Sequence, residues 1–268
     1  RTAGVPSDSD GQLRAGQSGA VYAVRFLPDD RRLLSGSEDG SLRLWNLTTG
    51  KTIRIWEHPD WVLDVVVDPT GSRCWSGCAD GMIREFAPDA APPIREFRAH
   101  EQAVTCLALD VDEEGRLRIV SASRDGSIRV WGAAGEPLRS LTFEPVAVTA
   151  LAARRGWIAA GNEAGVVTIW PSDATSPSVL RGHTRGVYAA AFSPDGKNLA
   201  TASGGRWIQN AGEVKLWDTA TGQVHATLPS LTAPLVFRGD GRMLAATDEP
   251  RRRIVLWEAA PYAAEHRP

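Results

Sequence analysis

The stretch SASRDGSIRVW, residues 121–131, decides the fold because two closely similar stretches precede it. Residues 35–45 read SGSEDGSLRLW, and residues 76–86 read SGCADGMIREF. In each, two short runs rich in Val, Ile, Leu and Trp flank an Asp-Gly pair, which is typical of two strands joined by a tight turn. Recurrence of one unit indicates a repeat architecture, which usually presents binding surfaces rather than a single catalytic site.

Each unit contains four such runs. In the first unit they cover residues 20–26, 33–37, 41–45 and 51–56, separated by segments rich in Gly, Pro, Asp and Asn. Long stretches with a 3.6-residue apolar period are missing, so we predict an all-β chain with almost no helix. A two-residue type I′ turn is expected at each Asp-Gly pair, because this turn needs φ > 0 at both positions and Asp-Gly tolerates it.

A large aromatic residue near the end of each third run sets the period. The spacings between these residues are 39–47, typical of propeller blades, and the six positions are Trp45, Phe86, Trp131, Trp170, Trp217 and Trp257. We therefore predict one β-propeller of four-stranded antiparallel blades over residues 11–258, with a flexible segment at 1–10 and a tail at 259–268. No good fourth strand follows Trp257, so residues 11–16 are expected to complete the last blade. Six blades are favoured, and a seventh blade outside this chain is the alternative.

At this level the chain resembles the WD-repeat β-propeller family, over roughly residues 11–258. The resemblance implies a hydrogen-bonded set in each blade, made of a His, a Ser or Thr, an Asp and the Trp. The third repeat looks complete, with His100, Ser121 or Ser123, Asp125 and Trp131. Such a set satisfies buried polar groups and fixes the blade geometry.

The other repeats depart from this pattern. The first repeat has Gln17 in place of the His, and the second has Phe86, which cannot donate a hydrogen bond. The fourth lacks the His and has Ala164 for the Asp, the fifth keeps His183 and Trp217 around an insertion, and the sixth keeps little beyond Trp257. This uneven conservation of the pattern within one chain predicts blades of unequal stability.

Composition excludes several classes of protein. The 268 residues carry a formal charge of −2, which does not favour nucleic acid or an anionic membrane. Apolar runs long enough to span a membrane are missing. Cys74 and Cys78 are four residues apart in a strand-like run, too far for a disulfide, and Cys106 takes a position that holds small residues in other repeats. Unpaired cysteines lean toward a reducing compartment, so we expect a cytoplasmic protein.

Catalysis is not expected. The His, Ser and Asp residues recur with the repeat, whereas a catalytic triad occurs once. Asp64 and Arg25 are the charged residues of the six innermost runs, and Asp64 is expected either to pair with a neighbouring blade or to line a wet channel. Phosphate loops, dinucleotide fingerprints and zinc spacings are missing, so we expect no cofactor and no metal.

A partner surface is predicted at two long loops between second and third runs, because insertions into a repeat often form the binding face. The loops lie within residues 203–217 and 247–257, and the candidate binding residues are Arg206, Trp207, Gln209, Asn210, Arg251, Arg252 and Arg253. Trp and Arg dominate interface hot spots, and an acidic protein segment would complement the arginines. The competing interpretation has Trp207 capping its own blade and the arginines paired with Glu249 and Glu213. Trp61, at the entry of the second blade, is a weaker candidate.

The sequence thus predicts a non-catalytic protein–protein interaction scaffold, with nucleic acid an improbable partner and the oligomeric state open. Phrases such as SPDGK, residues 193–197, resemble bacterial family members, which predicts a place in a larger bacterial assembly or multidomain protein. One alternative is a ligand-binding or enzymatic propeller that uses its central channel. Another is a structural subunit of a large complex, which apolar exposure on the outer strands, for instance near Trp56, would favour.

Overall fold

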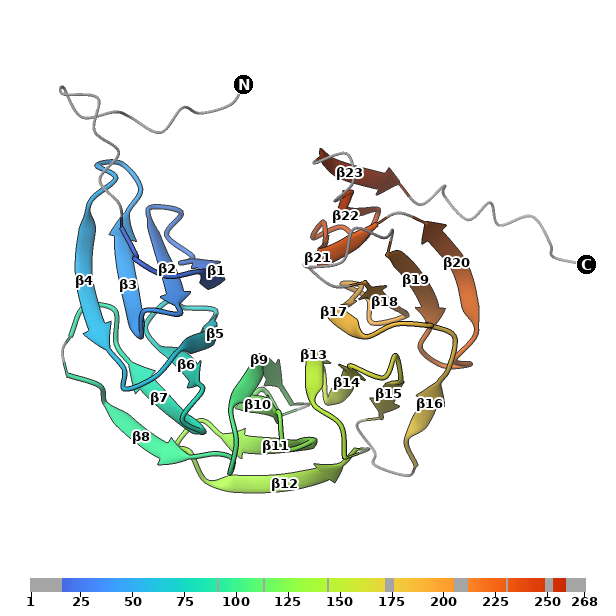
Figure 1. Ribbon diagram of the computed structural model, residues 1–268, viewed down its shortest axis with the longest axis horizontal. Coiled ribbons are helices and arrows are strands. Elements are labelled where there is room, and N and C mark those ends of the chain that lie inside the picture. Colours follow the sequence, from blue (N-terminus) through green and yellow to red (C-terminus); the bar gives the residue numbers. More distant parts are fainter. Residues whose placement is uncertain are drawn as a thin grey trace, which may run out of the picture. The chain divides into compact units, whose positions relative to one another are not determined.

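The fold is seen in a computed structural model, which describes residues 16–90, 92–112, 114–143, 145–171, 176–204, 212–229, 231–248 and 253–258. These residues form strands β1 to β23 and no helix (Figure 1). The all-β prediction is therefore confirmed for this part of the chain. Among the same residues, no helix long and apolar enough to cross a membrane is found.

The strands pair into six antiparallel sheets. Five sheets have four strands in sequence order, and the sheet formed by the last strands has three. The first two sheets consist of β1 (Val21–Phe26), β2 (Arg32–Ser37), β3 (Ser41–Asn46) and β4 (Thr52–Glu57), and of β5 (Val62–Val67), β6 (Cys74–Cys78), β7 (Met82–Phe86) and β8 (Arg95–Arg98). The third and fourth consist of β9 (Val104–Val111), β10 (Leu117–Ser123), β11 (Ser127–Gly132) and β12 (Pro137–Thr142), and of β13 (Val148–Arg154), β14 (Trp157–Asn162), β15 (Val167–Trp170) and β16 (Ser178–Leu180). The last two consist of β17 (Val187–Phe192), β18 (Asn198–Ser203), β19 (Glu213–Asp218) and β20 (Val224–Pro229), and of β21 (Thr232–Phe237), β22 (Met243–Asp248) and β23 (Arg253–Glu258).

The chain divides into two compact units. One comprises residues 1–109 and 121–125, and the other comprises residues 110–120 and 126–268. The residues of the third sheet are shared between the two. The first unit contains the sheets β1–β4 and β5–β8, and the second contains the last three sheets.

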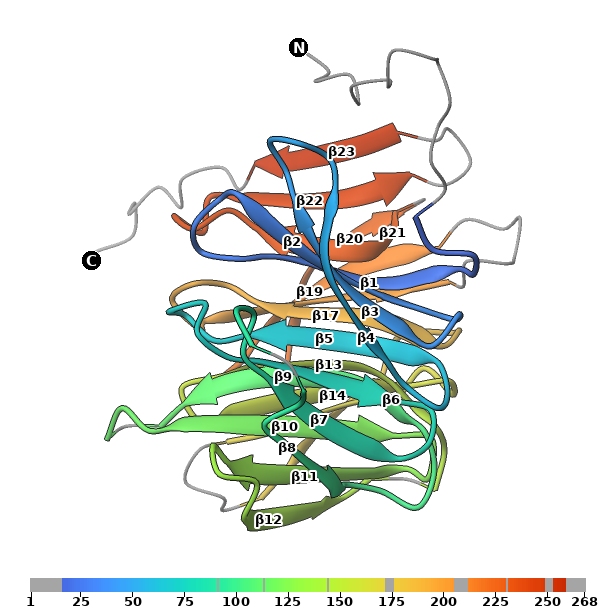
Figure 2. The same cartoon turned by 90° about the vertical axis from the view of Figure 1, so that its left-hand side faces the viewer.

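Within each unit, neighbouring sheets pack face to face. In the first unit, the β5–β8 sheet lies beside the β1–β4 sheet (Figures 1 and 2) and encloses a core that includes Leu34, Leu44, Val65 and Phe86. In the second unit, Leu199 and Trp217 of the β17–β20 sheet pack against the β13–β16 sheet. Each fully buried aliphatic side chain contributes about 1.5–3 kcal/mol. Packing on both faces explains why the strands read as short, nearly continuous apolar runs.

The turns between second and third strands correct the sequence-based prediction of type I′. Only the glycines have positive φ, at 78° for Gly40, 83° for Gly81 and 83° for Gly126. The Gly40 N–H donates to the Ser37 carbonyl at 3.2 Å, so the loop has three residues and ends on a left-handed glycine. Asp39 instead accepts from the Ser41 N–H at 2.9 Å. The Asp is needed for this side-chain cap and not for positive φ.

The last sheet exposes apolar residues. Along β23, Val255 and Trp257 face the core, whereas Ile254 and Leu256 are exposed on the other face. A fourth strand was predicted here from residues 11–16, and residues 11–15 lie outside the described part of the chain. Closure by this segment therefore stays a prediction, as does the choice between six and seven blades.

Candidate functional site

A network of side-chain hydrogen bonds links the strands of the fifth repeat. The network is complete despite the insertion in this repeat. His183 Nε2 lies 2.7 Å from Thr201 Oγ1, and Trp217 Nε1 donates to the same oxygen at 2.7 Å. His183 Nδ1 lies 3.0 Å from Glu213 Oε1. Because Trp only donates and an ionised Glu only accepts, the Thr hydroxyl donates to His183 Nε2 and His183 carries its proton on Nδ1. Glu213, at the start of β19, thus takes the place of the turn Asp.

The hydrogen-bond network of the first repeat is also complete, with Gln17 in the position of the His. Gln17 Oε1 accepts from Ser35 Oγ at 2.8 Å, and its Nε2 donates to the Ser41 carbonyl at 3.0 Å. Trp45 Nε1 donates to Ser35 Oγ at 2.8 Å. The amide both accepts and donates, so it can replace a neutral imidazole. The sequence marked Gln17 as a departure, but its hydrogen-bonding chemistry is equivalent.

Replacing Gln17 with Ala is expected to lower the free energy of unfolding by about 1–2 kcal/mol, because the Ser35 hydroxyl loses its acceptor and the Ser41 carbonyl loses a donor. Gln17→His should recover most of that loss. Urea unfolding followed by tryptophan fluorescence measures both variants. Equal stability of wild type and Gln17→Ala would contradict the role given to this amide.

In the third repeat, the structure distinguishes two serines that the sequence left as alternatives. His100 Nε2 lies 2.7 Å from Ser121 Oγ, and its Nδ1 lies 3.6 Å from Asp125 Oδ2. Ser123 Oγ instead accepts from the Asp125 N–H at 3.1 Å and shapes the turn. Trp131 is buried at the end of β11. The arrangement spans strands and is largely enclosed, which suits a structural role.

In the second repeat the network is incomplete, because Phe86 stands in the position of the Trp and cannot donate a hydrogen bond. His58 Nε2 lies 2.8 Å from Ser76 Oγ, and the His58 and Phe86 rings are 5.6 Å apart. Asp80 pairs with Arg84 at 2.7 Å. Burial, with the positive charge of Arg84 beside it, lowers the pKa of His58 to about 4. His58 is therefore neutral at physiological pH.

Asp64 joins three inner strands of the first unit. Its Oδ1 accepts from Arg25 Nη2 at 3.0 Å and its Oδ2 accepts from the Leu107 N–H at 2.8 Å. Arg25 lies on β1 and Leu107 on β9, so one carboxylate on β5 ties β1 and β9 to its own strand. Burial raises the pKa of Asp64, and Arg25 opposes that shift. Of the two expectations for this residue, the interstrand pairing is what the structure shows.

The cysteines are free thiols. Cys74 and Cys78 are buried and Cys106 is half-buried. Burial raises their pKa values, to about 12 for Cys74 and Cys106 and about 11 for Cys78, so the thiols stay protonated. Among the described residues, no group of three or more His, Cys, Asp or Glu side chains is placed to hold a metal ion.

The predicted loop surface falls largely outside the described residues. Of its members, only Arg253 is described, and its side chain is exposed; the others are Arg206, Trp207, Gln209, Asn210, Arg251 and Arg252. Glu213, one of the two acids expected to pair with these arginines in the competing interpretation, is bound to His183 and, at 3.3 Å, to Lys215. Both interpretations of the loops stay predictions.

A stacked aromatic pair is a candidate contact surface in the first unit. Trp61, just before β5, is 44% exposed, and its ring stacks on Tyr22 of β1 with centroids 6.0 Å apart and planes inclined by 26°. Its backbone is fixed, because the Trp61 N–H donates to Asp60 at 2.8 Å and its carbonyl accepts from the Ala79 N–H at 2.9 Å. Hydrogen bonds of the Trp61 backbone thus hold its exposed ring beside the half-buried Tyr22 ring, at a position that was only a weaker candidate from the sequence.

Comparison with known proteins identifies the repeat. The WD40 family model, described as "WD domain, G-beta repeat", matches residues 10–46, 91–132 and 174–218. These are the first, third and fifth repeats, which combine a His or Gln with a Trp. The three matched segments are WD40 repeats.

Curated relatives extend this similarity over most of the chain. It is 25% identical to the guanine nucleotide-binding protein subunit beta of Arabidopsis thaliana, over 91% of this chain and 69% of that protein. It is 29% identical to the nuclear distribution protein PAC1 of Coccidioides posadasii (strain C735), over 74% of this chain and 40% of that protein. It is 30% identical to telomerase protein component 1 of Rattus norvegicus, over 77% of this chain but only 8% of that protein.

Solved structures show the same fold. The structure of U3-55K superposes with a TM-score of 0.79 at 18% identity, covering 92% of this chain and 79% of that one. The crystal structure of the RRP9 WD40 repeats also gives a TM-score of 0.79 at 18% identity, covering 92% and 78%. The six sheets are therefore blades of a WD40 β-propeller.

Proposed function

We propose that this protein is a non-catalytic interaction scaffold that binds a protein partner through the Trp61–Tyr22 pair. The observation that carries the proposal is the exposed Trp61 ring, stacked on Tyr22 and held by hydrogen bonds of its own backbone. Trp and Tyr bury large areas at a small entropic cost and are enriched in interface hot spots. The recurring His, Ser and Asp residues bind one another within the sheets, and Asp64 has both carboxylate oxygens occupied.

Membership of a larger assembly is part of the proposal. The chain resembles 40% of the fungal PAC1 protein and 8% of the rat telomerase component, so in those relatives the similar region belongs to a longer polypeptide. A bacterial setting has no support from the relatives named here, which come from a plant, a fungus and a rat. A cytoplasmic location, based on the unpaired thiols, stays a prediction.

Replacing Trp61 with Ala is expected to weaken partner binding at least tenfold, or about 1.4 kcal/mol, while leaving the unfolding midpoint unchanged. The matched control is Ile55→Ala, because Ile55 of β4 is a large apolar residue with the same exposed fraction, 44%. Partners captured from a lysate of the source organism are quantified by mass spectrometry for wild type and both variants. Equal losses with Trp61→Ala and Ile55→Ala would count against the aromatic pair.

The loop surface around Trp207 and Arg251 to Arg253 stays a second predicted contact. Its arginines suit an acidic protein segment, as the sequence indicates. Adding a Trp207→Ala variant to the same capture experiment separates the two surfaces. Partners that are lost only with Trp207→Ala bind at the long loops rather than at Trp61 and Tyr22.

A structural-subunit role has one observation in its favour. Fourth strands expose apolar side chains, namely Ile53 and Ile55 on β4, Leu138 on β12, Val179 on β16 and Val224 on β20. Apolar exposure near Trp56 is the feature that would favour this role, and Ile53 and Ile55 supply it there. Trp56 itself is 5% exposed and packs on Phe86 with ring centroids 5.1 Å apart. The exposed residues are spread singly or in pairs over separate strands, which is ordinary for a protein surface.

A further inference from the structure

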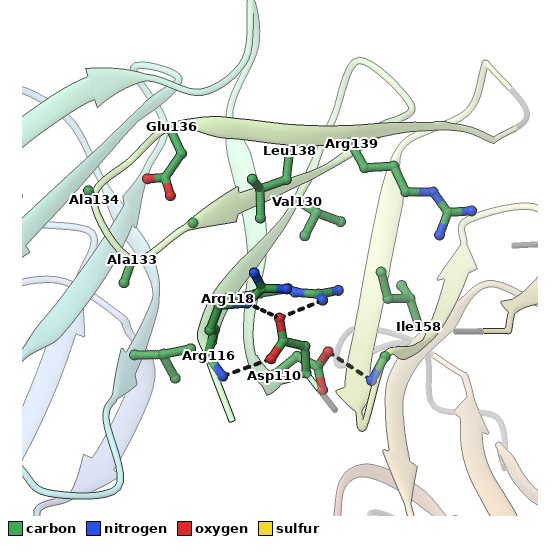
Figure 3. Close-up of a pocket in the computed structure, with 14 residues that line it drawn as sticks. Asp110, Arg116, Arg118, Val130, Ala133, Ala134, Glu136, Leu138, Arg139 and Ile158 are labelled. Atoms are coloured by element: carbon green, nitrogen blue, oxygen red, sulfur yellow. Dashed lines mark hydrogen bonds and ion pairs between the residues drawn. The ribbon is translucent and has the colours of Figure 1, made fainter. Parts of the chain in front are cut away.

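A pocket of about 680 Å³ lies within the second unit, at the turns that join first to second and third to fourth strands (Figure 3). Its walls come from the end of β9, the start of β10, the β11–β12 turn and the start of β14. Val130, Leu138 and Ile158 are apolar residues of its lining, and Asp110, Arg118 and Arg139 are charged ones. This volume and this mixed lining are typical of ligand sites, which range from about 300 to 1,000 Å³.

Asp110 in this pocket has an oxygen without a hydrogen-bond partner. The side chain is 4% exposed, and its Oδ2 accepts from the Gly156 N–H at 2.9 Å. Its Oδ1 is buried and has no partner among the residues that the structure describes. Burial raises the pKa of this carboxyl. An unsatisfied buried acceptor costs about 1–3 kcal/mol, so its retention on a pocket wall points to a ligand that supplies a donor.

The arginines of the pocket differ in their availability. Arg116 Nε and Arg118 Nη2 both bind Asp112, at 2.8 and 2.7 Å. Burial alone would raise the pKa of Asp112, but these two guanidinium groups outweigh it and hold that pKa well below its usual range. The Arg139 side chain makes no hydrogen bond or ion pair with the described residues, whereas its backbone is paired with β11. It is the cation in this pocket that a ligand can engage without displacing an internal pair.

Apolar surface continues beside Arg139. Leu138, its neighbour on β12, is 53% exposed, and Figure 3 shows Arg139 and Ile158 on the same side of the pocket. β12 is the edge strand of its sheet, so the pocket opens beside a strand that an extended chain can follow. A single available guanidinium next to aliphatic side chains suits one carboxylate with an apolar neighbour, rather than the many phosphates of a nucleic acid.

We propose that this pocket binds an extended peptide segment that places a carboxylate on Arg139 and an aliphatic side chain against Leu138 and Ile158. A peptide N–H supplies the donor for Asp110 after a rotation of that side chain, a common adjustment on binding. The site shares no residue with the Trp61–Tyr22 pair. It would therefore allow the scaffold to hold a second, acidic partner segment independently of the first.

The test is a selection of displayed random heptapeptides on the full chain, followed by fluorescence anisotropy of the selected sequences. We expect sequences with Asp or Glu beside Leu, Ile or Val, and a Kd that rises at least tenfold for Arg139→Gln. Arg95→Gln is the matched control, because Arg95 is a half-buried arginine on the outer strand β8 and lies outside the pocket. Circular dichroism confirms that both variants fold.

Three further measurements complete the test. Changing the acidic residue of the peptide to its amide should weaken binding as much as Arg139→Gln does, and Trp61→Ala should not change the Kd. Selected peptides that lack a carboxylate, or that bind Arg139→Gln as tightly as wild type, would overturn the proposal. Competition by inorganic phosphate as effective as by free peptide would also overturn it, since it would show a general anion site. A Kd changed by Trp61→Ala would assign the peptides to the aromatic pair instead.

Discussion

Thr201→Val should lower the free energy of unfolding by about 2–5 kcal/mol, although valine fills nearly the same volume. Thr201 Oγ1 is the single oxygen between His183 Nε2 and Trp217 Nε1, each 2.7 Å away. Without it, an acceptor and a donor in the interior both lose their partner. Urea unfolding at pH 7, followed by tryptophan fluorescence, measures the loss.

Thr201→Ser is the matched control for this prediction. It keeps the hydroxyl and removes one methyl group, which costs about 1 kcal/mol. The valine variant should therefore be the less stable of the two by more than about 1 kcal/mol, which exceeds the error of such a comparison. If the serine and valine variants unfold at the same urea concentration, the hydroxyl does not hold the blade together.

Acidification from pH 6.5 to 4 is expected to reduce stability by roughly 3 kcal/mol through His58. The pKa of His58 is about 4 in the folded protein, against 6.5 for the free side chain. The unfolded chain therefore takes up a proton in this window that the folded chain does not, and stability falls as the pH falls. Above about pH 7.5 both states are essentially neutral, so the slope from this residue vanishes there.

His58→Gln tests the assignment, because Gln17 shows that an amide can serve at the equivalent position of the first blade. This variant should lose stability less steeply between pH 6.5 and 4 than wild type. Part of the slope should persist, since burial also lowers the pKa of His183. Identical slopes for wild type and His58→Gln, measured by urea unfolding at each pH, would assign the titration to other groups.

Much of the fold could be predicted because the strands and turns of each repeat are marked by patterns of residues close together in the sequence. The third-strand aromatics, from Trp45 to Trp257, all fall at or near the end of a strand, and the strand bounds agree within one or two residues. The turn type was wrong because Asp-Gly is compatible with two hairpin geometries. What separates them is whether Glu38 joins the loop, and this depends on strand register rather than on the dipeptide.

The site was harder to predict because it depends on contacts between residues far apart in sequence. Glu213 replaces the turn Asp by reaching His183 from thirty positions away, and Gln17 replaces a His by equivalent hydrogen bonding. Trp61 was noted, but its stacking on Tyr22 requires two sheets to be adjacent. The unpartnered Asp110 oxygen has no sequence signal, since an Asp at the end of a strand is common.

The most direct test of the scaffold proposal places the photo-reactive residue p-benzoylphenylalanine at position 61, with position 55 as the control. Irradiation in a lysate of the source organism, followed by mass spectrometry, identifies proteins within reach of each side chain. We expect that partners captured by the wild-type chain crosslink from position 61 and not from position 55. Partners that are captured but never crosslink from position 61, or that crosslink equally from both positions, would contradict it.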